Sequence, residues 1–310
     1  MTFKTETMQE ILAWAREKLR HTDEISFHVL NPDYLEGYAG SRVRVEDREY
    51  LYRSLKSWAD FAELLHLRLH LPQVVSSTLV KLSFSSLKKE GFHSLEKSTE
   101  KYGIDSPFAE IHKMEEPAFL YYYQEALENV QIQHRKDILN FGINRADEFE
   151  VIASMVGSDA FAQKSFVGID HSQSAIEEAR RRFSEKNCTF YVKDLNDLSS
   201  LSLKRCDLFI SIGTLQSPSL SFKKLFMEIV QNYVDKEKGA IILGFPNSRW
   251  IGGEMVYGAK VPHYEMSELS LVCSDILFCK KYLQQKRYRV TITGKHYLFL
   301  TATKIGSLQS

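Results

Sequence analysis

The chain contains two neighbouring apolar stretches, DILNFGINRA over residues 137–146 and FVGIDHS over residues 166–172. In the first stretch the apolar residues are followed by Gly142, a residue that favours turns. In the second stretch they are followed by Asp170. A strand, a glycine turn, a helix and a second strand with an acidic tip make up the βαβ unit that binds nucleotides. Glycine lets a ligand approach the backbone closely, and a carboxylate accepts protons from ribose hydroxyls. The two stretches therefore predict a nucleotide-binding βαβ unit.

Three further apolar runs follow this unit. The run CTFYV over 188–192 precedes Asp194, the run DLFISIG covers 207–213, and GAIILG covers 239–244 after a helical pattern over 222–233. Apolar strands that alternate with helices are typical of a parallel sheet whose two faces are both covered. We therefore expect these runs to extend the sheet that the βαβ unit begins.

The end of the chain adds two strands of another kind. YRVTITG over 288–294 and HYLFLTA over 296–302 are separated by a tight turn. Strands joined so closely must be antiparallel, because a parallel crossover needs a dozen or more residues. A parallel sheet that finishes in an antiparallel hairpin is not expected of a dinucleotide dehydrogenase, in which the remaining strands continue in parallel.

Gly142, Asp170, Asp194 and the final hairpin occur in the order typical of class I S-adenosylmethionine-dependent methyltransferases, which the region 115–305 resembles. The resemblance implies an α/β fold with a Rossmann-like seven-stranded sheet and a C-terminal antiparallel hairpin, preceded by a smaller α+β domain. It implies S-adenosyl-L-methionine as cofactor, with Asp170 at the ribose and Asp194 at the adenine. The other cofactor-binding residues that we predict are Asn140, Gly142, Asn144, His171, Leu195, Ser211 and Gly213.

The first loop departs from the pattern of that family, acidic-apolar-Gly-x-Gly-x-Gly. Asn140 replaces the acidic residue, and Asn144 and Ala146 replace the second and third glycines. Asn tolerates a left-handed backbone better than most residues, and Ala is small enough for close packing. The turn can therefore still form, although a non-catalytic relative that binds the cofactor weakly is an alternative hypothesis.

A long segment rich in polar, aromatic and glycine residues follows the fifth parallel strand. Loops of this length inside a compact domain are usually functional, and we predict that residues 246–270 face the substrate. Tyr257 and His263 are the catalytic candidates, and Arg249, Glu254 and Tyr264 are the substrate-binding candidates. The competing hypothesis is a rigid loop that packs on the N-terminal domain.

Two domains are expected from the pattern of apolar residues. Residues 1–112 form an α+β domain for substrate selection or docking, with helical patterns within 1–25 and 50–69 and a strand within 74–84. Residues 113–310 form the methyltransferase domain, which a helical pattern within 106–130 introduces.

The composition limits the class of partner. The 310 residues include 40 Lys and Arg and 40 Asp and Glu, so the net charge is zero and a small-molecule acceptor is favoured over a nucleic acid. A tRNA or protein acceptor is the alternative. The sequence lacks a membrane-length apolar stretch and an apolar signal peptide, which predicts a cytoplasmic protein. The four cysteines lack metal-ligand spacing, so we expect no metal site.

Overall fold

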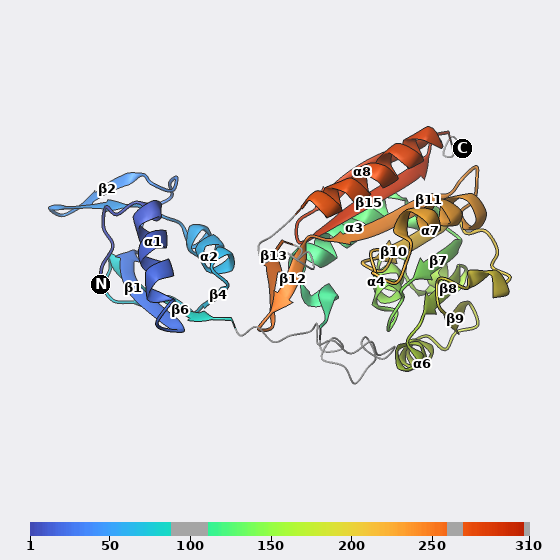
Figure 1. Cartoon of the computed structure of the whole chain (residues 1–310), viewed down its shortest axis with the longest axis horizontal. Helices are drawn as coiled ribbons and strands as arrows, with labels where there is room; N and C mark the ends of the chain where they lie inside the picture. Colours follow the sequence, from blue (N-terminus) through green and yellow to red (C-terminus); the bar gives the residue numbers. More distant parts are fainter. Residues whose placement is uncertain (88–110, 259–268, 307–310) are drawn as a thin grey trace. The chain divides into compact units, whose positions relative to one another are not determined.

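The computed structural model describes residues 1–87, 111–258 and 269–306. The chain forms two compact units (Figure 1). The first unit comprises residues 1–90 together with Arg249–Tyr257, and the second comprises residues 91–248 and 258–310. The predicted division at 112/113 stays a prediction. Residues 249–257 belong to the first unit, which agrees with the competing hypothesis that this segment packs on the N-terminal domain.

The first unit is built on a small antiparallel sheet in the order β1-β6-β4, with β5 paired to β6. A separate hairpin, β2-β3, belongs to the same unit. The elements are α1 (Met8–Lys18), β1 (Glu24–Leu30), β2 (Arg42–Val45), β3 (Arg48–Leu51), α2 (Leu55–Leu64), β4 (Leu67–Leu69), β5 (Gln73–Val74) and β6 (Leu79–Ser86).

Both helices of this unit pack on one face of its sheet. Alternate residues of β1 and β6 are buried, which is the period-2 pattern of a strand with one covered face. The α1 helix begins at Thr7 with a capping box to Glu10, and α2 begins at Ser54, whose hydroxyl accepts from a backbone N–H. The core between helices and sheet is mainly aromatic, with Phe27, Trp58, Phe61 and Phe84 at its centre.

The second unit contains a seven-stranded sheet in the order β14-β15-β11-β10-β7-β8-β9. Only β15 runs against its neighbours. The strands are β7 (Asp137–Phe141), β8 (Ser165–Asp170), β9 (Cys188–Val192), β10 (Leu208–Ile212), β11 (Ala240–Pro246), β14 (Tyr288–Gly294) and β15 (Tyr297–Lys304). The predicted fold class is therefore confirmed, including the antiparallel hairpin.

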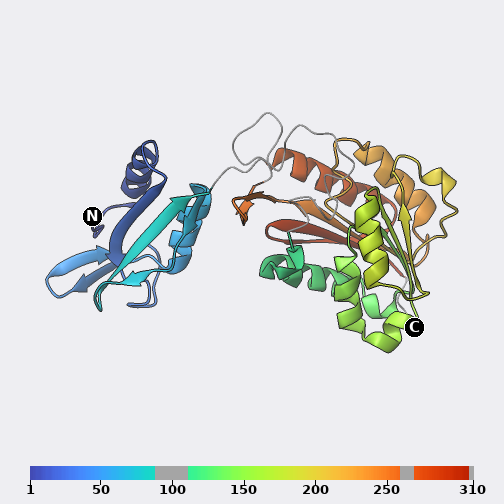
Figure 2. The ribbon, with the colours of Figure 1, turned by 90° about the horizontal axis from the view of Figure 1, so that it is seen from below.

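Helices cover both faces of this sheet, as Figures 1 and 2 show. The central strands are buried on both sides, so they read as continuous apolar runs in the sequence. One face carries α3 (Pro117–Asn129), α4 (Asp147–Val156), α5 (Ser158–Ala162) and α6 (Gln173–Arg182), and the other carries α7 (Phe222–Glu228), a π-helical turn (Ile229–Tyr233) and α8 (Ser270–Gln285).

The segment after β11 differs from the single long loop that the sequence predicts. It forms β12 (Ser248–Ile251) and β13 (Glu254–Tyr257), which pair with each other around Gly252 and Gly253. Both glycines have positive φ angles of 56° and 81°, a conformation that costs glycine little. A tight turn is therefore available at this point, and a hairpin replaces the loop.

One buried carboxylate fixes where the parallel strands begin. Asp207, 3% exposed, precedes β10 and accepts hydrogen bonds from the backbone N–H groups of Lys136 and Asp137 at 3.0–3.1 Å. These two amides start β7, so the carboxylate links the starts of two adjacent strands. An ionised carboxylate that accepts from backbone amides makes stronger bonds than a neutral acceptor.

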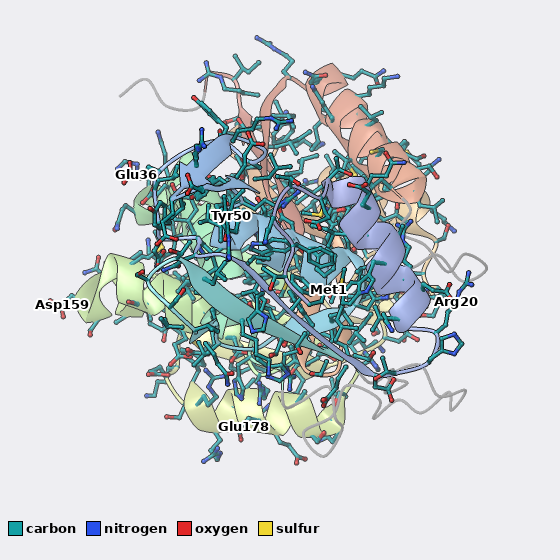
Figure 3. The ribbon with its side chains drawn as sticks, turned by 90° about the vertical axis from the view of Figure 1, so that its left-hand side faces the viewer. Met1, Arg20, Glu36, Tyr50, Asp159 and Glu178 are labelled. Carbon is teal, nitrogen blue, oxygen red and sulfur yellow. The ribbon has the colours of Figure 1, made fainter. Side chains whose placement is uncertain are left out.

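We expect Asp207→Ala to lower the free energy of unfolding by about 1–3 kcal/mol, because buried backbone amides lose their acceptor. Asp207→Asn keeps one acceptor oxygen and should lose less. Asp159→Ala, which removes an exposed carboxylate of α5 labelled in Figure 3, is the control and should change stability little. Urea denaturation measures the free energy of unfolding of all three variants. Equal stability of Asp207→Ala and wild type would contradict the linking role of Asp207.

Candidate functional site

The loop after β7 has an unusual backbone that its sequence accommodates. Gly142, Asn144 and Ala146 have φ angles of 77°, 48° and 65°, so every second residue is left-handed. These are the three positions at which the resembled family has glycine. Asn is among the residues that visit this conformation most readily, whereas Ala rarely adopts it. The conformation expected from a glycine-rich loop is therefore present although two glycines are replaced.

Gly142 is the one position of this loop that excludes any side chain. A Cβ atom built there would lie 1.8 Å from the hydroxyl oxygen of Thr214 and 2.6 Å from its Cβ. Thr214 follows β10, so the ends of two adjacent strands meet over the glycine. The backbone of Gly142 donates to the carbonyl oxygen of Ile169 at 2.8 Å, which holds the loop against β8.

Asp170, at the tip of β8, lies beside this loop. Its carboxylate accepts from the N–H groups of Asn144 and Ser172, both at 3.0 Å, and His171 Nδ1 lies 3.3 Å away. Burial alone would raise the pKa of Asp170, but the hydrogen bonds from His171, Ser172 and Asn144 lower it below its ordinary value. The side chain is therefore a buried, fully ionised acceptor.

The side-chain amide of Asn140, next to the loop, has no hydrogen-bond partner among the described residues. It is 1% exposed, and neither its amide nitrogen nor its amide oxygen has a hydrogen-bond partner in the described residues. It lies in β7 opposite Gly168 and Ile210, on the same face as Ile138. A buried amide without partners costs free energy, so its presence at a strand end points to a ligand group that would pair with it.

The remaining predicted cofactor residues also lie at or near this edge of the sheet. Asp194 follows β9 and accepts from both nitrogens of Asn196 at 2.8 and 3.0 Å, while its neighbour Leu195 is buried. Gly213 ends β10 with a φ of 73°. The Ser211 hydroxyl is buried and donates to the carbonyl oxygen of Phe141 at 3.0 Å, so its observed role is to link two strands.

Three residues that the sequence analysis did not select gather at the same edge. Tyr297, at the start of β15, places its hydroxyl 3.6 Å from where a Cβ of Gly213 would lie. The Lys113 ammonium lies 5.3 Å from the centre of the Tyr297 ring. Glu148, in the first turn of α4, is electrostatically coupled to Lys113 and Asp170. They come from sequence-distant elements, so no local motif could have identified them.

Three predicted acceptor residues have partners in the first unit. Glu254 pairs with Arg68 at 2.7 Å, and Arg68 also donates to the carbonyl oxygen of Gly252. The guanidinium of Arg249 lies 3.0 Å from His66 Nε2. The backbone N–H of Tyr257 donates to Glu63 at 2.6 Å. These contacts agree with the packing hypothesis, and roles of Arg249, Glu254 and Tyr257 toward an acceptor stay predictions.

The hairpin also contributes apolar residues to the first unit. Ile251 and Val256 form a small buried cluster with Leu87, and Val256 is 3% exposed. The other two acceptor candidates, His263 and Tyr264, lie outside the described residues. Within the described ranges, no group of His, Cys, Asp or Glu side chains is arranged to hold a metal ion. No helix described there is long and apolar enough to cross a membrane.

Val256→Ala tests the packing of the hairpin. Removing two buried carbon atoms should cost about 1.6 kcal/mol of stability, or more if a cavity remains. Val74→Ala is the matched control, because it removes the same two carbon atoms from a side chain of β5 that is 76% exposed, and it should change stability little. Thermal unfolding measures the stability of both variants. Amide exchange across 249–257 in the wild type tests the packing itself, and fast exchange there would contradict it.

Gly142→Ala should destabilise the second unit in two ways, by left-handed strain of about 1–2 kcal/mol and by overlap with Thr214 costing about 1–3 kcal/mol. The double variant Gly142→Ala with Thr214→Gly removes the overlap and should recover that second part alone. A double-mutant cycle on thermal stability separates the two contributions. Additive effects would show that Thr214 does not restrict this position.

The chain is similar to solved methyltransferase structures at low sequence identity. No curated protein sequence matches the chain. The plantazolicin methyltransferase BpumL in complex with SAH is 14% identical with a TM-score of 0.46, covering 66% of this chain and 93% of that one. The N-methyltransferase NodS from Bradyrhizobium japonicum WM9 is 14% identical with a TM-score of 0.42, covering 61% and 88%. A SAM-dependent methyltransferase from Aquifex aeolicus is 17% identical with a TM-score of 0.41, covering 64% and 98%.

The match to a family model concerns the sequence itself. Residues 146–290 match the model described as a methyltransferase domain. This range runs from the last residue of the loop after β7 to β14, so it includes Asp170, Asp194 and Gly213. Residues 146–290 are therefore similar to a methyltransferase domain, which agrees with the resemblance found in the sequence.

Proposed function

We propose that this protein is an S-adenosylmethionine-dependent methyltransferase that acts on a small-molecule acceptor. The observation that carries the proposal is the ionised Asp170 carboxylate at the tip of β8, which is bonded to the left-handed loop that follows β7. A carboxylate has about four lone-pair positions, of which Asn144, Ser172 and His171 use three. Asp170 can therefore still accept a proton from a ribose hydroxyl.

The surrounding residues fit the rest of the cofactor. Gly142 leaves the backbone at the strand end without a side chain, so a ligand can approach it closely. The Asn140 amide, which has no hydrogen-bond partner in the described residues, offers a donor and an acceptor there. Asp194 retains acceptor capacity for the adenine amino group. When bound, the cofactor supplies a methyl group on a positively charged sulfur, which leaves as a neutral thioether. The protein need not form a covalent intermediate.

The chain's own residues would contribute orientation and exclusion of water. Methyl transfer gains most from holding the acceptor atom in line with the methyl group. Tyr297 and Gly213 lie at the strand ends where the acceptor would approach, and the Tyr297 ring is held edge-on against Phe119 at 5.0 Å. A ring fixed in this way, with a hydroxyl at its end, can position an acceptor without losing much side-chain freedom.

The balanced charge of the chain supports a small acceptor, because binding a polyanion requires a field of Lys and Arg. The first unit, which includes the hairpin, would select this acceptor. The non-catalytic hypothesis rested on the replaced glycines. Its support is weakened by the left-handed conformations that Asn144 and Ala146 adopt.

Calorimetry with S-adenosylmethionine, S-adenosylhomocysteine and NAD tests the cofactor. The first two should bind, and NAD should not. Asp170→Ala should weaken binding of S-adenosylhomocysteine by about 1.5–3 kcal/mol, the usual scale for a hydrogen bond to a charged group. Asp159→Ala is the control for removing a carboxylate from the same unit. Failure of both ligands to bind at millimolar concentration would reject the proposed function.

A further inference from the structure

Arg182, the last residue of α6, extends its side chain to the loop that follows β7. Its Nη1 donates to the carbonyl oxygen of Arg145 at 2.6 Å and to the carboxylate of Asp147 at 2.5 Å. Its Nη2 donates to the carboxylate of Glu150 at 2.5 Å. One guanidinium thus holds the end of the loop and the first turn of α4 together. A planar group with several fixed donors suits this task better than an ammonium.

The residue enclosed by these contacts is Ala146. Arg145 precedes it and Asp147 follows it, so Arg182 holds the peptide carbonyl on one side of Ala146 and a side chain on the other. Ala146 has a φ of 65° and a ψ of 32°, which is the left-handed region. A residue other than glycine keeps such a conformation only where its surroundings impose it. The contacts of Arg182 can impose it, because they fix both neighbours.

The start of α4 is otherwise weakly held. Its N-cap residue is Ala146, whose side chain has no hydrogen-bonding group, and the described residues supply no side-chain cap there. By contrast, α1, α2 and α6 begin at Thr7, Ser54 and Ser172, whose hydroxyls accept from backbone N–H groups. Arg182 therefore fixes a helix start that lacks the usual capping side chain.

The conformation at Ala146 is connected to the carboxylate of Asp170. Two residues before Ala146, the N–H of Asn144 donates to Asp170 Oδ2 at 3.0 Å. Asp170 Oδ1 accepts from the N–H of Ser172, the N-cap of α6, and Arg182 ends the same helix. These contacts form a closed ring that runs from Asp170 along α6, across to the loop and back. A different backbone conformation at Ala146 would break the ring beside Asp170.

We propose that Arg182 is a positioning residue for cofactor binding, which holds the loop after β7 in the left-handed conformation that a glycine at position 146 would adopt unaided. The proposal rests on the proposed function, because it takes Asp170 and this loop as the part of the site that binds the ribose. Arg182 acts through the loop and is assigned no contact with the cofactor.

The proposal has a consequence for affinity. A ligand binds only those molecules whose loop is in the competent conformation, so the apparent dissociation constant rises as that fraction falls. The left-handed conformation is disfavoured for alanine by a factor of about five or more, whereas glycine adopts it readily. Loss of Arg182 should therefore weaken binding, and glycine at position 146 should restore it.

Calorimetry with S-adenosylhomocysteine tests this on wild type, Arg182→Met, Ala146→Gly and the double variant. Arg182→Met removes the guanidinium and should raise the dissociation constant about fivefold or more. Adding Ala146→Gly to Arg182→Met should recover most of this loss. The same substitution in wild type should strengthen binding by a smaller factor, because Arg182 already imposes the conformation there.

Arg181→Met is the matched control. It removes the same charge from the neighbouring position of α6, but the Arg181 side chain is 76% exposed and pairs with Glu178 of its own helix. Its affinity should be that of wild type. Arg182→Lys keeps the charge with fewer donors in less fixed directions, so its affinity should lie between those of Arg182→Met and wild type. If circular dichroism shows that Arg182→Met is unfolded, Arg182→Lys with and without Ala146→Gly replaces it.

Thermal unfolding separates positioning of the loop from a general effect on stability. The methyl group of Ala146 is fully buried, so the packing lost in Ala146→Gly opposes the relief of strain. The melting temperature of the double variant should therefore stay close to that of Arg182→Met while its affinity recovers. A merely structural role of Arg182 would not give recovery of affinity alone.

Wild-type affinity in Arg182→Met would overturn the inference. A double variant that binds as weakly as Arg182→Met would overturn it too, because Arg182 would then act on something other than the backbone at Ala146. If wild type binds neither S-adenosylhomocysteine nor S-adenosylmethionine, the proposed function is rejected and the inference falls with it. The behaviour of the wild type thus distinguishes failure of the proposed function from failure of the inference.

Discussion

The carboxylate of Asp170 is the group on which the arrangement of the site depends. It accepts from Asn144 in the loop after β7 and from Ser172, the N-cap of α6, while it belongs to the end of β8. One side chain thus joins two strand ends and a helix start. Because the acceptor is ionised and buried, these bonds are strong, and they orient the carboxylate for a ligand as well.

The loop that Asp170 holds shows how a departure from a glycine pattern is accommodated. Asn144 and Ala146 take left-handed conformations that glycine would take more easily. The strain at Ala146 is offset by its neighbours, because Arg182 of α6 donates to the carbonyl oxygen of Arg145 and pairs with Asp147 and Glu150. Only Gly142 is irreplaceable by geometry, since Thr214 occupies the space of a side chain there.

The hairpin after β11 belongs to the first unit, although the residues on either side of it belong to the second. Its strands leave the sheet at Ser248, whose hydroxyl donates to the carbonyl oxygen of His296, and return at Gly258, whose N–H donates to the carbonyl oxygen of Asn247. Between these points the chain pairs with Glu63, His66 and Arg68.

The sequence determined the sheet, its order of elements and the glycine and acidic residues at its edge. These features are local: apolar runs of strand length, a turn of one or two residues, and a carboxylate at a strand tip. Asp170 and Gly142 could be predicted because parallel strands place their carboxyl ends at one edge. The final hairpin was predictable from the shortness of its turn alone.

Only the tertiary structure decided which of the polar residues meet. Lys113, Glu148 and Tyr297 are separated by up to 184 positions. Whether they meet depends on how the 3-10 turn Lys113–Glu115, α4 and β15 pack, which no periodicity encodes. Arg249, Glu254 and Tyr257 read as residues of a loop facing a ligand, yet their partners belong to the first unit. A charged side chain looks the same in sequence whether it binds a ligand or an ion-pair partner, because the difference lies in what the fold brings within a few ångströms of it.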